Sequence, residues 1–100
     1  MKVKGLRFAW DSAKAAANLK KHGISFEDGK TIFSDPDELM LDDPDHSEGE
    51  LRLISIGRAS SGSLVLACYT EVDGTIRLIS VRKAEPAEIF AYRHQGEQDA

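Results

Sequence analysis

The second half of the chain contains three strand-like segments joined by two very short connectors. Residues 51–58, 64–71 and 75–82 are rich in apolar and β-branched side chains, as is typical of β-strands. The connectors contain turn residues, and the Asp73-Gly74 pair is a strong hairpin signal. Connectors this short join antiparallel neighbours, because parallel strands need a long crossover. This half of the chain therefore predicts a three-stranded antiparallel meander.

Capping residues in the first half predict two consecutive helices. Asp11 is suited to N-cap a helix over 12–22, and Gly23 is the expected stop. Ala13, Ala16 and Leu19 form a thin apolar stripe along that helix. Ser25 begins a capping sequence for a second helix over 26–33. Gly29 within this second helix costs roughly 1 kcal/mol relative to alanine.

Shorter elements complete the pattern, with strands at 4–9 and 38–41 and a last helix over 86–95 that begins at Pro86. We expect one α+β domain over residues 1–100 with a mainly antiparallel β-sheet. The sheet comprises the C-terminal meander and the short N-terminal strands, and two N-terminal helices and one C-terminal helix accompany it. We expect the helices to pack on one face of the sheet, so that the other face is open to water or to a ligand.

The aromatic residues supply much of the expected core. We assign Phe8, Phe26, Phe33 and Phe90 to the core, and Trp10 to the core or to a staple beside the first helix. The lone Cys68 lies in an apolar run, where a buried and inert thiol is expected. A single cysteine forms no intrachain disulfide.

Charge is unevenly distributed along the chain, although the net charge is only −4. Residues 1–30 hold seven Lys/Arg and three Asp/Glu, whereas residues 31–50 hold eight Asp/Glu and no Lys/Arg. The net charge argues against a protein that coats nucleic acid through its whole field, but a local basic patch is compatible with it. With no apolar stretch for a signal peptide or a membrane span, we expect a soluble, cytoplasmic protein.

Cationic side chains occur in two further patterns. Asp11, Lys14, Asn18 and Lys21 are three or four residues apart, so they project from one face of the predicted first helix. Arg77 and Arg82 interrupt an otherwise apolar strand. Cations on rigid elements at both ends of the chain suggest a site for a polyanion.

The residues also match the pattern of a known family. The matching motifs are Trp10-Asp11, Lys14, Asn18, Lys21-His22-Gly23-Ile24, Phe26-Glu27, Phe33, Asp35-Pro36, His46, Glu48, Arg52, Gly57-Arg58, Arg77, Ile79-Ser80, Arg82-Lys83-Ala84, Glu88 and Tyr92. In their order and spacing they resemble the BrnT toxin family over about residues 7–93. The resemblance implies a RelE-like fold and metal-independent RNA cleavage that inhibits translation, with no cofactor. It also implies a BrnA-type ribbon-helix-helix antitoxin, through which the complex would bind operator DNA.

Four positions depart from that pattern. Val81 and Gly29 stand where alanine is commoner, Leu51 where glutamate is commoner, and Ile89 where an arginine usually follows the glutamate. The loss of a cation at Ile89 supports an alternative, a catalytically weak or inactive toxin-like module that acts through its antitoxin and operator complex. A plain structural α+β protein is a third alternative.

Metal-free RNA cleavage needs cations to stabilise the charged pentacoordinate phosphate. It also needs a base to activate the 2′-hydroxyl and an acid to protonate the leaving oxygen. Arg52, Arg77 and Arg82 are the candidates for charge stabilisation, and ion pairing within the fold is their alternative role. His22, His46, Glu88 and Tyr92 are the acid–base candidates. For them the alternatives are a helix C-terminal contact for His22, a loop anchor for His46, and a Tyr92–Glu88 hydrogen bond.

Candidate RNA-binding residues are Lys14, Asn18, Lys21 and Lys83, whose side chains can contact the phosphate backbone. For the first three the leading interpretation is a solvated helix face, and a contact with the antitoxin is a further alternative. The acidic stretch from 35 to 50 has no direct role toward phosphate, and we expect a solvated loop, a segment that repels misplaced RNA, or a contact for a basic part of the antitoxin.

Overall fold

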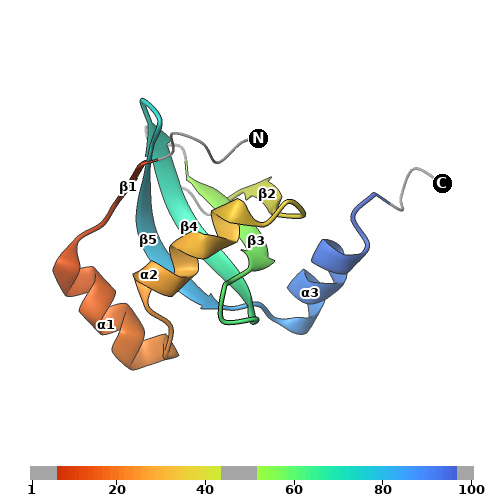
Figure 1. The fold of residues 1–100 in the computed structure, drawn as a ribbon, viewed down its shortest axis with the longest axis horizontal. Coiled ribbons are helices and arrows are strands. Elements are labelled where there is room, and N and C mark those ends of the chain that lie inside the picture. The colour runs from red at the N-terminus through yellow and green to blue at the C-terminus, as the bar shows by residue number, and fades with distance from the viewer. Residues whose placement is uncertain (1–6, 44–51, 97–100) are drawn as a thin grey trace.

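The computed structural model describes residues 7–43 and 52–96. Within them it has three helices and a five-stranded sheet, which confirms the predicted α+β class (Figure 1). The strands are β1 (Arg7–Ala9), β2 (Leu39–Asp42), β3 (Leu53–Arg58), β4 (Leu64–Val72) and β5 (Thr75–Lys83). The helices are α1 (Ser12–His22), α2 (Phe26–Gly29), continued by a 3-10 helix over Lys30–Ser34, and α3 (Pro86–Arg93). Among these helices, none has the length and apolar character that a membrane crossing requires.

The sheet is mixed, with the strand order β1-β5-β4-β3-β2. Strands β2 to β5 pair antiparallel in sequence order, and the predicted meander is confirmed as β3-β4-β5. The β4–β5 hairpin turns at Asp73 and Gly74, whose φ angles of 52° and 79° suit this residue pair. The exception is β1, which pairs in parallel with β5. That pairing joins distant parts of the chain, so no local signal predicts it.

Helix α1 begins and ends where its capping residues predict. The Asp11 carboxylate accepts from the Lys14 amide at 2.9 Å, and Gly23 adopts the left-handed conformation with φ of 74°. The face that α1 turns toward the sheet differs from the prediction, however. Asn18 is buried and Ala15 packs on the core, whereas Leu19 of the expected apolar stripe is 50% exposed.

The second predicted helix is α-helical only at its start. Ser25 accepts from the Asp28 amide at 3.0 Å, as its capping role predicts, but α2 ends at Gly29 and the chain tightens into the 3-10 helix. At Gly29 the backbone lies so close to β5 that a Cβ atom would stand 2.6 Å from Val81 Cγ1. Glycine therefore permits the close packing of α2 on the sheet.

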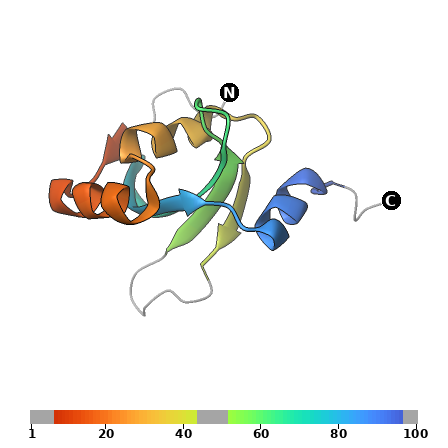
Figure 2. The same cartoon turned by 90° about the horizontal axis from the view of Figure 1, so that it is seen from below.

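Helix α3 packs on part of the sheet face opposite α1 and α2, so the prediction that the helices all lie on one face is wrong. The larger core lies between α1, α2 and the sheet and contains Phe26, Phe33 and Tyr69, with Phe8 and Trp10 packed against it. Figure 2 shows α1 and α2 together on one side of the strands and α3 apart from them. A separate cluster of Ile56, Leu66 and Tyr92 seats α3 against the other face. We call the face under α1 and α2 the first face, and the opposite one the second face.

The prediction that Phe90 belongs to the core is wrong. Phe90 is 63% exposed on α3, and its ring stacks on His94 with 4.1 Å between the ring centroids. In the short helix α3 the inward contact is made by Tyr92. Phe90 lies two residues before Tyr92, on a different side of the helix, and therefore faces outward.

Candidate nucleic-acid interface

A bulge in β5 places Arg77 and Arg82 on the same face of the sheet. In a regular strand, residues five apart point to opposite faces. Here Tyr69 pairs with Leu78 but Cys68 pairs with Ser80, so one residue of β5 is left unpaired. Leu78 and Val81 both reach the core under the helices. The two arginines on either side of them therefore lie on the second face.

Arg52 joins this face from the edge of β3. Arg52 immediately precedes β3, and its charge acts on the Cys68 thiol of β4, where it favours the thiolate. Arg77 pairs with Thr70 of β4. Among the described residues, Arg77 is exposed and has no ion pair, and Arg52 Nε is buried with no hydrogen bond. The exposed guanidinium of Arg77 is available to an anion.

Arg82, in contrast, is already paired. Its guanidinium donates to both carboxylate oxygens of Glu88, at 2.9 and 2.8 Å. Glu88 Oε1 also accepts from the Glu85 amide at 2.7 Å, which completes a capping box at the start of α3. The Arg82 hydrogen bonds keep the pKa of Glu88 below its ordinary value. This arrangement matches the ion-pair alternative for Arg82 and makes Glu88 a poor proton donor.

Tyr92 contacts Asp35 and not Glu88, so the expected Tyr92–Glu88 hydrogen bond is wrong. The Tyr92 hydroxyl donates to Asp35 Oδ2 at 2.5 Å, and the same oxygen accepts from the Arg58 amide at 2.8 Å. Burial and the Asp35 carboxylate raise the pKa of Tyr92 to about 12. Burial favours the neutral form of Asp35, but the hydrogen bonds outweigh it and lower its pKa. Tyr92 is therefore neutral at pH 7 and cannot act there as a general base.

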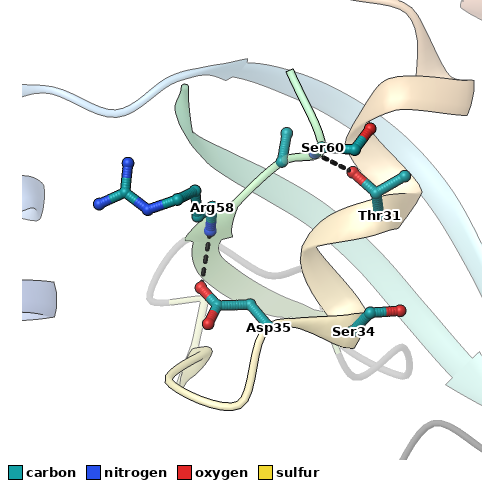
Figure 3. Close-up of a pocket in the computed structure, with 6 residues that line it drawn as sticks. Thr31, Ser34, Asp35, Arg58 and Ser60 are labelled. Carbon is teal, nitrogen blue, oxygen red and sulfur yellow. Dashed lines mark hydrogen bonds between the residues drawn. The ribbon is translucent and has the colours of Figure 1, made fainter. Parts of the chain in front are cut away.

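A hollow of about 450 Å³ lies beside Asp35 (Figure 3). The hydroxyl groups of Thr31 and Ser60 are already paired within the fold. Thr31 Oγ1 donates to the Asp28 carbonyl and accepts from the Ser60 amide at 2.8 Å, and the Ser60 hydroxyl donates to the Asp28 carboxylate. These contacts anchor the β3–β4 turn to α2 and to the 3-10 helix that follows it, and we assign the hollow a structural role.

The guanidinium of Arg58 points away from Thr31, Ser34 and Ser60 (Figure 3). It lines a second groove of about 270 Å³ between the β3–β4 turn and α3. Lys83 and Arg93 line the same groove, together with Ile89, and no acidic residue lines it within the described residues. Lys83 is thus the one predicted RNA-binding residue that lies near other cations at a groove.

Of the other predicted residues, three lie on the opposite side of the sheet, one is buried and one lies outside the described residues. Lys14, Lys21 and His22 lie on α1, which covers the first face, so the sheet separates them from Arg77. The expectation that Asn18 shares their exposed face is wrong, because Asn18 is only 7% exposed. Its amide nitrogen donates to the Ile24 and Val81 carbonyls, and its oxygen accepts from the Val81 amide. His46 lies outside the described residues.

The thiol of Cys68 is half-buried at the second face, and its pKa supports the expected inert character. Burial and the hydrogen bond to Asp43 raise the pKa of Cys68 to about 11, so little thiolate forms near neutral pH.

Sequence reasoning missed Arg58, Arg93 and His94 as candidate site residues. Arg58 ends a strand and Arg93 ends a helix, where cations commonly have only structural roles. The available signal was weak: Arg58 belongs to the Gly57-Arg58 motif of the family pattern, whereas nothing local marks Arg93 or His94.

The chain is similar to known proteins both in sequence and in fold. A family model described as the ribonuclease toxin BrnT of type II toxin–antitoxin systems matches residues 10–88. The 1.1 Å crystal structure of the Brucella abortus ribonuclease toxin BrnT matches with a TM-score of 0.58 and 24% sequence identity. The match covers 80% of this chain and 97% of that chain, and at this identity it supports the fold alone. No protein of curated function matches the sequence.

Proposed function

Because the chain belongs to the BrnT family of ribonuclease toxins of type II toxin–antitoxin systems, we propose that it cleaves RNA without a metal ion and thereby inhibits translation. We further propose that a BrnA-type ribbon-helix-helix antitoxin neutralises it and that operator DNA is bound through that antitoxin. The observation that carries the nuclease proposal is Arg77, an exposed cation on the second face of the sheet that has no ion pair among the described residues.

In metal-free cleavage, the 2′-hydroxyl attacks the adjacent phosphate, and negative charge accumulates on the non-bridging oxygens. A guanidinium group on a strand offers two parallel N–H donors in a fixed geometry, which matches two of these oxygens. Arg77 is exposed near the start of β5, where it pairs with Thr70 of β4, and Arg52 immediately precedes β3. We assign the charge stabilisation to these two residues, since both are without a carboxylate partner among the described residues.

Arg82, Glu88 and Tyr92 then act as positioning residues. The Arg82–Glu88 pair ties the end of β5 to the first turn of α3, and Tyr92 ties the same helix to Asp35. Loss of any of them would shift α3 relative to the sheet. Their pairing also favours the second candidate function, a toxin-like module that binds its antitoxin with little or no catalysis.

Induced expression with a readout of cellular RNA integrity tests the proposal. We compare the wild-type chain with Arg77→Ala, and use Lys20→Ala, an exposed cation on α1, as the matched control. Wild type and control should arrest growth and degrade RNA, and co-expression of the antitoxin should relieve both effects. Removal of one transition-state donor typically lowers the rate about 100-fold or more, so Arg77→Ala should largely abolish the effect.

Two results would count against this assignment. Equal RNA breakdown by wild type and Arg77→Ala, at equal protein levels, would remove Arg77 from the site. Intact RNA in cells that express folded wild-type chain would refute the nuclease and leave the binding module.

A further inference from the structure

The groove between the β3–β4 turn and α3 has three cationic side chains that the fold does not use in ion pairs. Arg58, Lys83 and Arg93 are exposed, and none has a carboxylate within 4 Å among the described residues. Arg58 donates to the Gly62 carbonyl at 2.9 Å, which orients its guanidinium; its charge also acts on the Asp35 carboxylate, without an ion pair between the two side chains. In a chain of net charge −4, three such cations around one groove form a local anion-binding surface.

The walls of this groove are held in place by carboxylates that face inward. Asp35 accepts from the Arg58 amide and from the Tyr92 hydroxyl, so it links the strand wall to the helix wall. The Glu88–Arg82 pair performs the same function one residue before Lys83. Arg58, Lys83 and Arg93 are therefore presented on a pre-organised frame, which lowers the entropic cost of binding.

An exposed aromatic ring adjoins the groove on α3. Ile89 and Arg93 also line a neighbouring hollow of about 340 Å³, together with Phe90 and His94. Phe90 is 63% exposed, and its ring packs against the His94 imidazole. Cations along a groove beside an exposed aromatic platform are the combination by which proteins bind single-stranded nucleic acid.

We propose that this groove binds the backbone of single-stranded RNA, with phosphates at Arg58, Lys83 and Arg93 and a base stacked on Phe90. The inference rests on the proposed function, because it adds a binding subsite for the same substrate next to the strand arginines. An acidic protein segment would use the cations but would gain little from an unpaired aromatic face. A purely structural role for Arg93 at the C-terminus of α3 would leave RNA affinity unchanged when it is replaced.

Fluorescence anisotropy with a labelled 2′-O-methyl RNA oligonucleotide measures binding by the full chain while cleavage is blocked. Arg93→Ala and Lys83→Ala should each weaken binding several-fold and reduce the slope of log K against log salt by about 0.7. Phe90→Ala should weaken binding by about 5- to 100-fold with little change in that slope. Lys20→Ala on the far side of the sheet is the matched control and should bind as wild type.

A rescue variant tests whether RNA binding requires a cation within this groove, and Lys20→Ala controls for the general loss of one positive charge. Ile89 lines the same groove one helical turn before Arg93, so Ile89→Arg should restore affinity to Arg93→Ala. Thermal unfolding of each variant shows whether it folds. We expect each variant to fold, because the substituted side chains are exposed or half-buried.

The outcomes distinguish this inference from the proposed function. Unchanged RNA affinity and salt slope in Arg93→Ala and Lys83→Ala would overturn the groove assignment even if the wild type cleaves RNA. If these variants bind RNA more weakly than the wild type, and the wild-type chain cleaves no RNA, the groove assignment would be supported and the nuclease proposal refuted. Loss of antitoxin binding with unchanged RNA affinity would also overturn it, since the groove would then be a protein contact.

Discussion

Substitution of Gly29 by alanine tests the close packing of α2 on β5. A helix-propensity argument predicts that alanine stabilises this position by about 1 kcal/mol. The structure predicts the opposite sign. A Cβ atom at residue 29 would lie 2.6 Å from Val81 Cγ1 and 3.2 Å from Val81 Cβ, whereas favourable carbon contacts begin near 3.5 Å.

The magnitude follows from how little room Val81 has. Val81 is fully buried and β-branched, so it cannot rotate away from the new methyl group. Overpacking of this kind costs about 2–3 kcal/mol, and the gain in helix propensity offsets about 1 kcal/mol of it. We expect Gly29→Ala to lower the free energy of unfolding by about 1–2 kcal/mol.

A double-mutant cycle makes the test specific. Val81→Ala removes two methyl groups and should cost about 2–3 kcal/mol through lost burial and a cavity. In the double variant the methyl group added by Gly29→Ala occupies part of that cavity. The double variant should therefore lose only about 1–2 kcal/mol, well below the sum of the single losses.

Urea unfolding followed by circular dichroism and by Trp10 fluorescence measures these energies, because Trp10 packs edge-on against Phe26 beside α2. A Gly29→Ala variant as stable as wild type, or a double variant whose loss equals the sum of the single losses, would refute the packing argument.

Three further predictions concern buried or paired polar groups. Asn18→Ala should lower the free energy of unfolding by roughly 2–4 kcal/mol in urea titrations, since three buried backbone groups lose their partner. The folded pKa of Glu88 lies below its ordinary 4.5, so its stabilisation is complete above that pH and is lost as pH falls through the folded pKa. Wild type should therefore lose stability on acidification more steeply than Glu88→Gln, and parallel profiles would contradict the pairing with Arg82. Native Cys68, with a pKa of about 11, should react with iodoacetamide at pH 8 at least tenfold more slowly than the unfolded chain, and equal rates would show that Asp43 and burial do not protect it.

Local signals in the sequence determined most element boundaries. The caps at Asp11, Gly23 and Ser25 each act within a few residues, and the structure has them as expected. The three meander strands start or end within about two residues of their predicted bounds, since alternating apolar residues and the Asp73-Gly74 turn act locally.

The candidate site depended on contacts that no local signal encodes. A spacing of five between Arg77 and Arg82 indicates opposite faces in a regular strand, and only the unpaired residue between them in the β4–β5 ladder puts both on the second face. The inward turn of Asn18 follows from carbonyl groups on Val81 and at Ile24, which lie elsewhere in the chain.

The sequence by itself therefore determined the order of helices and strands, the meander and the family, because capping, turns and periodicity depend on neighbours along the chain. Tertiary structure alone decided which cations meet. Arg58, Lys83 and Arg93 belong to three different elements, and they line one groove only because Asp35 and Glu88 fix α3 against the ends of β3 and β5. Such contacts form between residues far apart in sequence, where no local preference acts.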